Sequence, residues 1–347
     1  MELDVLYHQV KESVSSLDHN RIWPGFKPLR FALYDDKRCY FDGQWVEKTD
    51  AFCANTSIVF NGEQIAIWMV QEELKPSVLA SKLVHEMFHG YQNMTGVMLN
   101  APNEFEALFR YKYDAENLSL KLRENELLLE LMDQFDEDKL AELLAHRKLR
   151  SELFPYEFAY ETKEEEIEGA ANYVEWQVLK QLDESAADAL TARMREMMTK
   201  PEFLFPIRIS CYYTGALMIN ALLAAGMYGF EPSVRSVLLS VLDDIAPSCG
   251  DLPDKEALKS AAESAVKAFN KKTDEIIRSA LENGQVVLNG PAELKGVNVY
   301  NARCLNGFIT STYFLMYNDG AEDKMLFGDF VIEMQDEKTI ARAYRWL

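Results

Sequence analysis

The segment His85-Glu86-Met87-Phe88-His89 contains two histidines four positions apart. Histidines with this spacing can hold a metal ion. Residues four apart lie on the same face of a helix, so the imidazoles of His85 and His89 can reach one ion. The pattern favours zinc, and the carboxylate of Glu86 would lie close enough to a zinc-bound water to take its proton. It therefore indicates hydrolysis by a metal-activated water.

A zinc site that does chemistry needs a third protein ligand and a position left open for water. The remaining histidines stand alone in the sequence, namely His8, His19 and His146. No third histidine follows His89 closely either, so the ligand has to come from a carboxylate or thiolate elsewhere in the chain. Without such a ligand, the two histidines are only polar residues on a helix that flank a glutamate.

A helix predicted to begin at Thr162 offers carboxylates for this role. Thr162 and Glu165 have the spacing of a capping box, which is typical of a helix N-terminus. One face of this helix would carry Glu168, Asn172 and Glu175. Gly169 has no side chain, so we expect it to let this helix closely approach the helix that carries His85 and His89, which we call the metal helix.

The segment Glu168-Gly169-Ala170-Ala171-Asn172-Tyr173-Val174-Glu175 resembles the E-G-x-A-x-Y-x-E segment of the gluzincin metallopeptidases, which include the zinc aminopeptidases and leukotriene hydrolases. The resemblance implies that Glu168 is the third zinc ligand. A shorter segment, Tyr212-Tyr213-Thr214-Gly215-Ala216, is similar to the Y-x-x-G-A element of the same family. It implies that the hydroxyl of Tyr212 stabilises the oxyanion. The three segments occur in the order found in the family.

Two features depart from that family. Glu168 lies 79 positions after His89 (168 minus 89), which is a far longer gap than in the classical members of the family. The acidic helical segment between them would therefore be an insertion in the catalytic domain. The strands before His85 contain no G-x-M-E-N segment, which binds the free amine of the substrate in the aminopeptidases. An endopeptidase and an amidase therefore stay open beside an exopeptidase.

The resemblance and the residues together predict a zinc metallopeptidase that cleaves a peptide or protein substrate. Glu86 would act first as a general base and then as a general acid, and Asn172 would either orient a histidine ligand or face the solvent. The segment 64–70 is a candidate strand for pairing with an extended peptide, or a plain sheet strand under the metal helix. The alternatives are a zinc amidase acting on a non-protein substrate, a non-catalytic zinc-containing binding protein, and a helical interaction module without metal.

The amino-acid composition limits the kinds of partner that we expect for this protein. Acidic residues outnumber basic ones 56 to 36, and the net charge of -20 repels phosphate backbones and anionic membranes, so we expect neither nucleic acid nor a membrane as a partner. The first ten residues do not read as a secretory signal, and the apolar stretch 216–230 is predicted to be a core helix. Five scattered cysteines without C-x-x-C spacing favour a reduced, cytoplasmic protein.

The elements that must position these residues follow from local signals. The metal helix is predicted to begin near Pro76 and to end at Thr95-Gly96. A small antiparallel sheet precedes it, with a hairpin turn at Asn61-Gly62. The chain from 102 to 225 has helical periodicity, with a helical hairpin over 118–153 that is interrupted near 135–138.

Two more helices are predicted over 232–245 and 253–281, and the last sixty residues alternate apolar and polar side chains as an antiparallel sheet does. The predicted fold class is therefore α+β, with an N-terminal sheet, a mostly helical middle and a C-terminal sheet. We expect three subdomains, over 1–100, 101–284 and 285–347.

Overall fold

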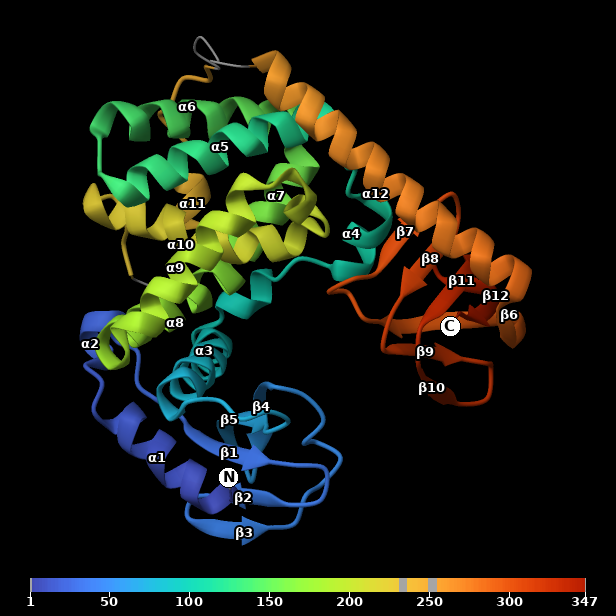
Figure 1. Ribbon diagram of the computed structural model, residues 1–347, viewed down its shortest axis with the longest axis horizontal. Helices are drawn as coiled ribbons and strands as arrows, with labels where there is room; N and C mark the ends of the chain where they lie inside the picture. Colours follow the sequence, from blue (N-terminus) through green and yellow to red (C-terminus); the bar gives the residue numbers. More distant parts are fainter. Residues whose placement is uncertain (1, 231–235, 249–254, 347) are drawn as a thin grey trace.

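A computed structural model describes residues 2–230, 236–248 and 255–346 (Figure 1). Within these residues a helical middle is joined to one β-sheet near the N-terminus and to another near the C-terminus. The α+β fold class is therefore confirmed.

The N-terminal sheet has five strands in the order β3-β2-β1-β5-β4. Their bounds are β1 Arg30–Tyr34, β2 Cys39–Phe41, β3 Gln44–Val46, β4 Thr56–Phe60 and β5 Glu63–Met69. The hairpin predicted at Asn61-Gly62 joins β4 to β5. The prediction of a purely antiparallel sheet is wrong at one pairing, because β1 and β5 run parallel. Both strands lie inside the sheet and are largely buried, which is the usual setting of parallel pairs.

The metal helix is α3 (Pro76–Thr95), and its bounds are those predicted. Pro76 occupies the first turn, where no hydrogen bond is lost, and Gly96 ends the helix with a left-handed φ of 81°. The apolar side of α3 packs with α1 (Leu3–Ser15) against the N-terminal sheet.

The helical middle contains the predicted hairpin, formed by α5 (Ala115–Asp133) and α6 (Glu137–Leu153). The other helices of the first 230 residues are α2 His19–Ile22, α4 Glu104–Arg110, α7 Pro155–Glu164, α8 Ala170–Leu182, α9 Glu184–Thr199 and α10 Ile207–Ala224, with short turns η1 Val97–Asn100, η2 Glu165–Gly169 and η3 Pro201–Leu204.

The helix start predicted at Thr162 is wrong. The chain is already helical from Pro155, and it continues from α7 through the π-helical turn η2 into α8. The capping box fails because its two residues are buried and serve other partners. The carboxylate of Glu165 accepts hydrogen bonds from Lys121 and Arg147 instead of capping a helix.

Helix α10 runs through the centre of the helical middle and contacts α5, α7, α8 and η2. Among the described residues it is the one helix whose length and composition would allow it to cross a membrane, and more than half of that stretch is buried inside the protein. It overlaps the first part of the core helix predicted over 216–230 and begins earlier in the chain.

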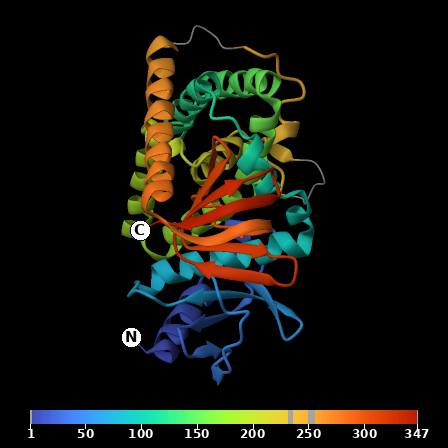
Figure 2. The same ribbon diagram turned by 90° about the vertical axis from the view of Figure 1, so that its right-hand side faces the viewer.

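The C-terminal sheet has seven strands in the order β10-β9-β6-β12-β11-β8-β7, and every described pairing is antiparallel, as predicted. The strands are β6 Gln285–Val297, β7 Arg303–Leu305, β8 Phe308–Ser311, β9 Phe314–Asn318, β10 Asp323–Phe327, β11 Phe330–Met334 and β12 Thr339–Arg345. Figure 2 shows this sheet with the long helix α12 (Lys255–Asn283) beside it. Apolar residues of α4 pack against the sheet as well.

The two helices predicted over 232–245 and 253–281 lie partly outside the described residues, at 231–235 and 249–254. The described part of the first contains only the short helix α11 (Val237–Ser240). The second is present as α12, which ends at Asn283 beside the glycine that signalled its end.

Candidate metal centre

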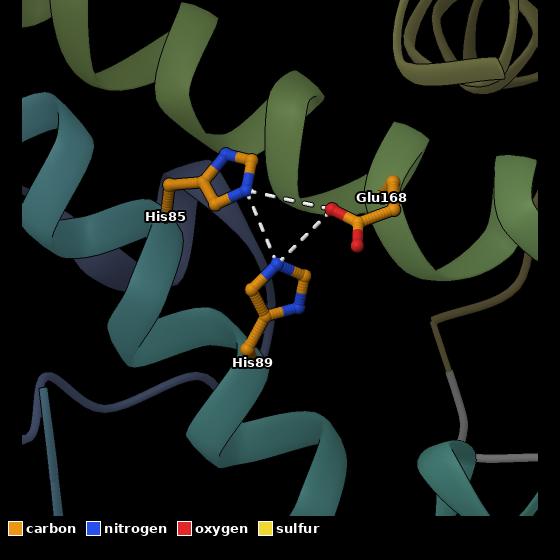
Figure 3. A group of neighbouring side chains, drawn as sticks. All are labelled: His85, His89 and Glu168. Carbon is orange, nitrogen blue, oxygen red and sulfur yellow. Dashed lines mark hydrogen bonds and ion pairs between the residues drawn. The ribbon is translucent and has the colours of Figure 1, made fainter. Parts of the chain in front are cut away.

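Three donor atoms from two helical segments converge on one point (Figure 3). Nε2 of His85 and Nε2 of His89 are 3.1 Å apart. Oε2 of Glu168 lies 3.3 Å from the nitrogen of His89 and 3.8 Å from that of His85. Ligands at about 2.0–2.1 Å around a tetrahedral zinc ion are separated by roughly 3.3 Å, so these spacings fit a shared ion. The structure thus contains a His-His-Glu group that could hold a metal.

The two histidines are presented by successive turns of α3, which lies directly on the N-terminal sheet. Gly90, beside His89, faces the sheet. A Cβ atom at Gly90 would collide with the side chain of Leu29 and would lie 2.9 Å from Oγ of Ser57. The absence of a side chain at this position therefore leaves room for these side chains under the helix that carries the histidines.

Glu168 comes from the π-helical turn η2 on the opposite side of the site. Such turns insert a residue into a helix and are frequent at functional sites. Oε1 of Glu168 accepts a hydrogen bond of 2.6 Å from Nη2 of Arg208, which leaves Oε2 facing the histidines. Arg208 also pairs with Glu104 and Glu164, so its guanidinium is fixed by three carboxylates. The sequence carried no signal for Arg208 beyond its position one turn before Tyr212 on α10.

The other ring nitrogens of both histidines face acceptors. Oε2 of Glu175 lies 3.2 Å from Nδ1 of His85, and Oε1 of Gln92 lies 2.8 Å from Nδ1 of His89. Gln92 is itself held, since its Nε2 donates to the carbonyl of Ile167 at 3.0 Å. When each ring carries its single proton on Nδ1, beside these oxygens, both Nε2 lone pairs point at the same place. This arrangement is favourable when a cation sits between them, and the donor set fits zinc.

The charges around the site favour a cation at the histidines. Burial lowers the pKa of His85, but Glu168 and Glu175 outweigh it and raise that pKa to about 10. Burial likewise raises the pKa of Glu168, and its contacts with His85 and His89 more than compensate, so it lies well below the usual range. Glu168 therefore remains a carboxylate, which is the form that can bind a metal.

Glu86 lines the cleft beside His85 and has no hydrogen bond or ion pair with any described residue. Burial is the main reason that its pKa is raised above the ordinary value. The carboxylate of Glu86 is thus available to a substrate or a water in the cleft.

Tyr212 of α10 lies beside His85. Its ring is nearly parallel to that of His85, with centroids 6.3 Å apart, and its hydroxyl shares a hydrogen bond of 3.2 Å with the hydroxyl of Tyr300. Tyr300 belongs to the segment between β6 and β7, so the C-terminal sheet contributes to the wall of the cleft. No motif pointed to Tyr300.

Two sequence-based expectations about this region are wrong. Asn172 does not orient a histidine, because its Nδ2 donates to the carbonyl of Tyr212 at 3.0 Å and so joins α8 to α10. The helix that follows Gly169, α8, does pack closely against α3, but Gly169 is not the point of contact. Gly169 touches Gly215 of α10, where a Cβ on Gly169 would lie 2.5 Å from the Cα of Gly215.

The cleft around the three donor atoms has a volume of about 430 Å³, within the range of small-ligand sites. Trp68, Leu190 and Met98 give it apolar wall, and the start of β4 lies at its margin. The segment 64–70, expected to pair with a substrate, corresponds to β5, which lies between β1 and β4 and has no free edge. The edge strand of this sheet beside the cleft is β4.

No protein-family model matches the chain, and neither the curated proteins nor the solved structures include one that is significantly similar to it. What the structure shows is the group of His85, His89 and Glu168 that could hold a metal ion.

Proposed function

We propose that this protein is a zinc-dependent hydrolase that cleaves peptide bonds. The observation that carries the proposal is the convergence of the two Nε2 atoms and Oε2 of Glu168 on one point, next to the unpaired carboxylate of Glu86. Two histidines and a carboxylate are a known ligand set of catalytic zinc, whereas structural zinc sites are closed by four protein ligands. No fourth ligand joins this group among the described residues.

Zinc bound by His85, His89 and Glu168 would supply an activated water and polarise the substrate carbonyl. The carboxylate of Glu86 would accept the proton of that water and then deliver it to the leaving nitrogen, so one residue serves as base and acid in turn. The hydroxyl of Tyr212 would donate a hydrogen bond to the carbonyl oxygen as negative charge develops there. Arg208 and Glu175 would act through the ligands, by holding Glu168 and His85 in place.

A peptide substrate is supported by the position of β4. This strand is an edge of the N-terminal sheet, and Asn55, Thr56 and Ser57 at its start line the cleft. The free backbone groups of an edge strand can pair with an extended peptide, which then runs past the metal ligands. The apolar wall formed by Trp68 and Leu190 would accept an adjacent side chain.

Metal analysis and one variant test the proposal together. We expect one zinc ion per chain in protein purified without added metal, and turnover of a mixture of internally quenched peptides. Glu86→Gln should keep the zinc and lower kcat by about a hundredfold or more, because the general base is lost while the ligands remain. Glu73→Gln is the matched control, since Glu73 is an exposed glutamate shortly before α3.

Each part of the proposal fails on a separate result. Substoichiometric zinc that does not respond to His89→Ala would contradict the metal site. Unchanged turnover in Glu86→Gln would contradict the proposed chemistry. Turnover of small amides with none of the peptides would replace the peptidase by an amidase.

A further inference from the structure

A second cavity lies between α12 and the C-terminal sheet, apart from the metal cleft. Its volume is about 480 Å³, which is enough for a small organic ligand. Apolar groups make up most of its wall, including Phe205, Ala265, Phe269, Ile276 and Trp346. The polar residues of its wall include Arg303, Thr310 and Ser311, and we name it the Arg303 cavity.

Arg303 is a buried cation without a counter-charge among the described residues. Only 7% of its surface is exposed, and its guanidinium stacks on Phe269 at 3.5 Å from the ring centroid. Nη2 donates to Oδ1 of Asn270, whereas Nε and Nη1 have no acceptor within the described part of the chain. Burial lowers the pKa of Arg303 to about 10, so it remains protonated at neutral pH. Nε1 of Trp346, in the same wall, also finds no acceptor among the residues that the structure describes.

This arrangement contrasts with the other buried arginines of the described chain. Each of the others is paired with at least one carboxylate, and they are Arg123, Arg147 and Arg150. The remaining charged residues that line the Arg303 cavity are Glu202 and Lys272, which are exposed and opposite in sign. Burying a cation with unused donors is costly unless an anion accepts from them.

We propose that the Arg303 cavity binds a monocarboxylate with an aliphatic or aromatic body. Its carboxylate would accept a charge-assisted hydrogen bond from Nη1 of Arg303, which is one of the two donors without an acceptor among the described residues. Its body would lie against Phe205, Phe269 and Ile276. A carboxylate fits better than a phosphate. The single guanidinium balances one negative charge, and the apolar wall has no group that would balance a second negative charge.

Calorimetric titration of the full chain compares three probes. Sodium octanoate combines a carboxylate with an apolar body, octanamide has the same body without charge, and inorganic phosphate has charge without a body. We expect one octanoate site per chain, with at least about tenfold tighter binding than octanamide, because hydrogen bonds to charged groups are the stronger ones. Phosphate should not bind. Equal affinity for octanoate and octanamide would mean apolar adsorption only and would overturn the proposal.

Variants then assign the binding to Arg303. Arg303→Met should remove the preference for octanoate and should raise or leave unchanged the melting temperature, because an uncompensated buried charge is replaced by an apolar side chain of similar length. Arg342→Met, at an exposed arginine of the same sheet, is the matched control and should bind like the wild type. A preference that survives Arg303→Met would overturn the proposal.

One further variant keeps the test decisive. If Arg303→Met does not fold, Ala265→Phe should fill the cavity and abolish octanoate binding while leaving the zinc content unchanged. Retained octanoate binding in Ala265→Phe would place the ligand elsewhere and overturn the proposal.

Discussion

Gly169 and Gly215 touch at the point where the segment carrying Glu168 crosses the helix carrying Tyr212. A Cβ on Gly169 would lie 2.5 Å from the Cα of Gly215, and a Cβ on Gly215 would lie 2.5 Å from the carbonyl oxygen of Glu165. Both obstacles are backbone atoms, which cannot rotate aside. The contact therefore fixes how η2 and α10 lie relative to each other, and with them the proposed third ligand and the proposed oxyanion donor.

Gly215→Ala should destabilise the protein and displace Glu168. We expect the free energy of unfolding to fall by about 1–3 kcal/mol, as for other overpacked positions, and zinc affinity to fall with it. Urea unfolding and a chelator titration measure the two effects. Gly229→Ala is the control, because no atom of the described residues would lie within 4 Å of a Cβ there. If Gly215→Ala keeps the stability of this control, the contact does not constrain the crossing.

The sequence predicted best those features that depend on neighbouring residues. Pro76 and Gly96 mark the ends of α3 by local backbone preferences, and the spacing of His85 and His89 fixes their common face on that helix. The alternation after residue 285 likewise needs only the two-residue period of a strand. These signals act within a few residues, so they can be recognised without knowing the fold.

The features that the sequence did not predict depend on contacts between distant segments. Arg208 and Tyr300 reach the site only because α10 and the C-terminal sheet are placed beside it. The capping box at Thr162 failed for a related reason, since Glu165 neutralises buried cations from other helices. The parallel pairing of β1 with β5 was missed because a local hairpin signal reveals nothing about pairing between strands distant in the chain.

Arg208→Met should weaken metal binding although Arg208 is not a ligand. Its loss frees Oε1 of Glu168 and leaves Glu104 and Glu164 without their cation, so the ligand is no longer fixed toward the histidines. Removing such outer contacts typically costs 10–100-fold in metal affinity. Competition with a chromophoric chelator gives the affinity, and Arg195→Met provides an exposed arginine as control. A zinc affinity within twofold of the wild type would show that Arg208 does not position the ligand.

Kinetics can distinguish the role of Tyr212 from that of Tyr300. Tyr212→Phe should lower kcat by about a hundredfold, with little change in KM, because a donor to the transition state is lost. Tyr300→Phe should lower kcat/KM by less than about tenfold, since it removes only a hydrogen bond that orients Tyr212. Tyr313→Phe, at an exposed tyrosine between β8 and β9, is the control. Equal losses for Tyr212→Phe and Tyr300→Phe would contradict these separate roles.

The buried ion pairs of Glu161 and Glu165 should control how the stability of the protein changes in acid. Glu165 is fully buried and accepts from Nζ of Lys121 at 2.8 Å and from Nη2 of Arg147 at 2.6 Å. Burial raises the pKa of Glu165, but the two cations outweigh it and hold that pKa far below the ordinary 4.5. Burial also raises the pKa of Glu161, but neighbouring positive charges, chiefly that of Arg150, outweigh it and lower that pKa below its ordinary value.

A carboxylate with a depressed pKa in the folded state contributes stability that is fully present above its unfolded pKa, near 4.5, and is lost as the pH falls towards its folded value. We therefore expect the free energy of unfolding to fall steeply below about pH 4.5, by up to roughly 1.4 kcal/mol per pH unit for each such group. Urea unfolding at a series of pH values from 7 to 3 measures this slope.

Glu165→Gln isolates the share of that slope that belongs to Glu165. At pH 7 it should lower the free energy of unfolding by about 3–5 kcal/mol, because Lys121 and Arg147 lose a buried counter-charge. Below pH 4.5 the variant should lose less stability per pH unit than the wild type, since the titrating group is gone. Glu196→Gln, at a partly exposed glutamate paired with Lys200, should change neither quantity by more than about 1 kcal/mol. Parallel acid curves for the wild type and Glu165→Gln would mean that other carboxylates control acid unfolding.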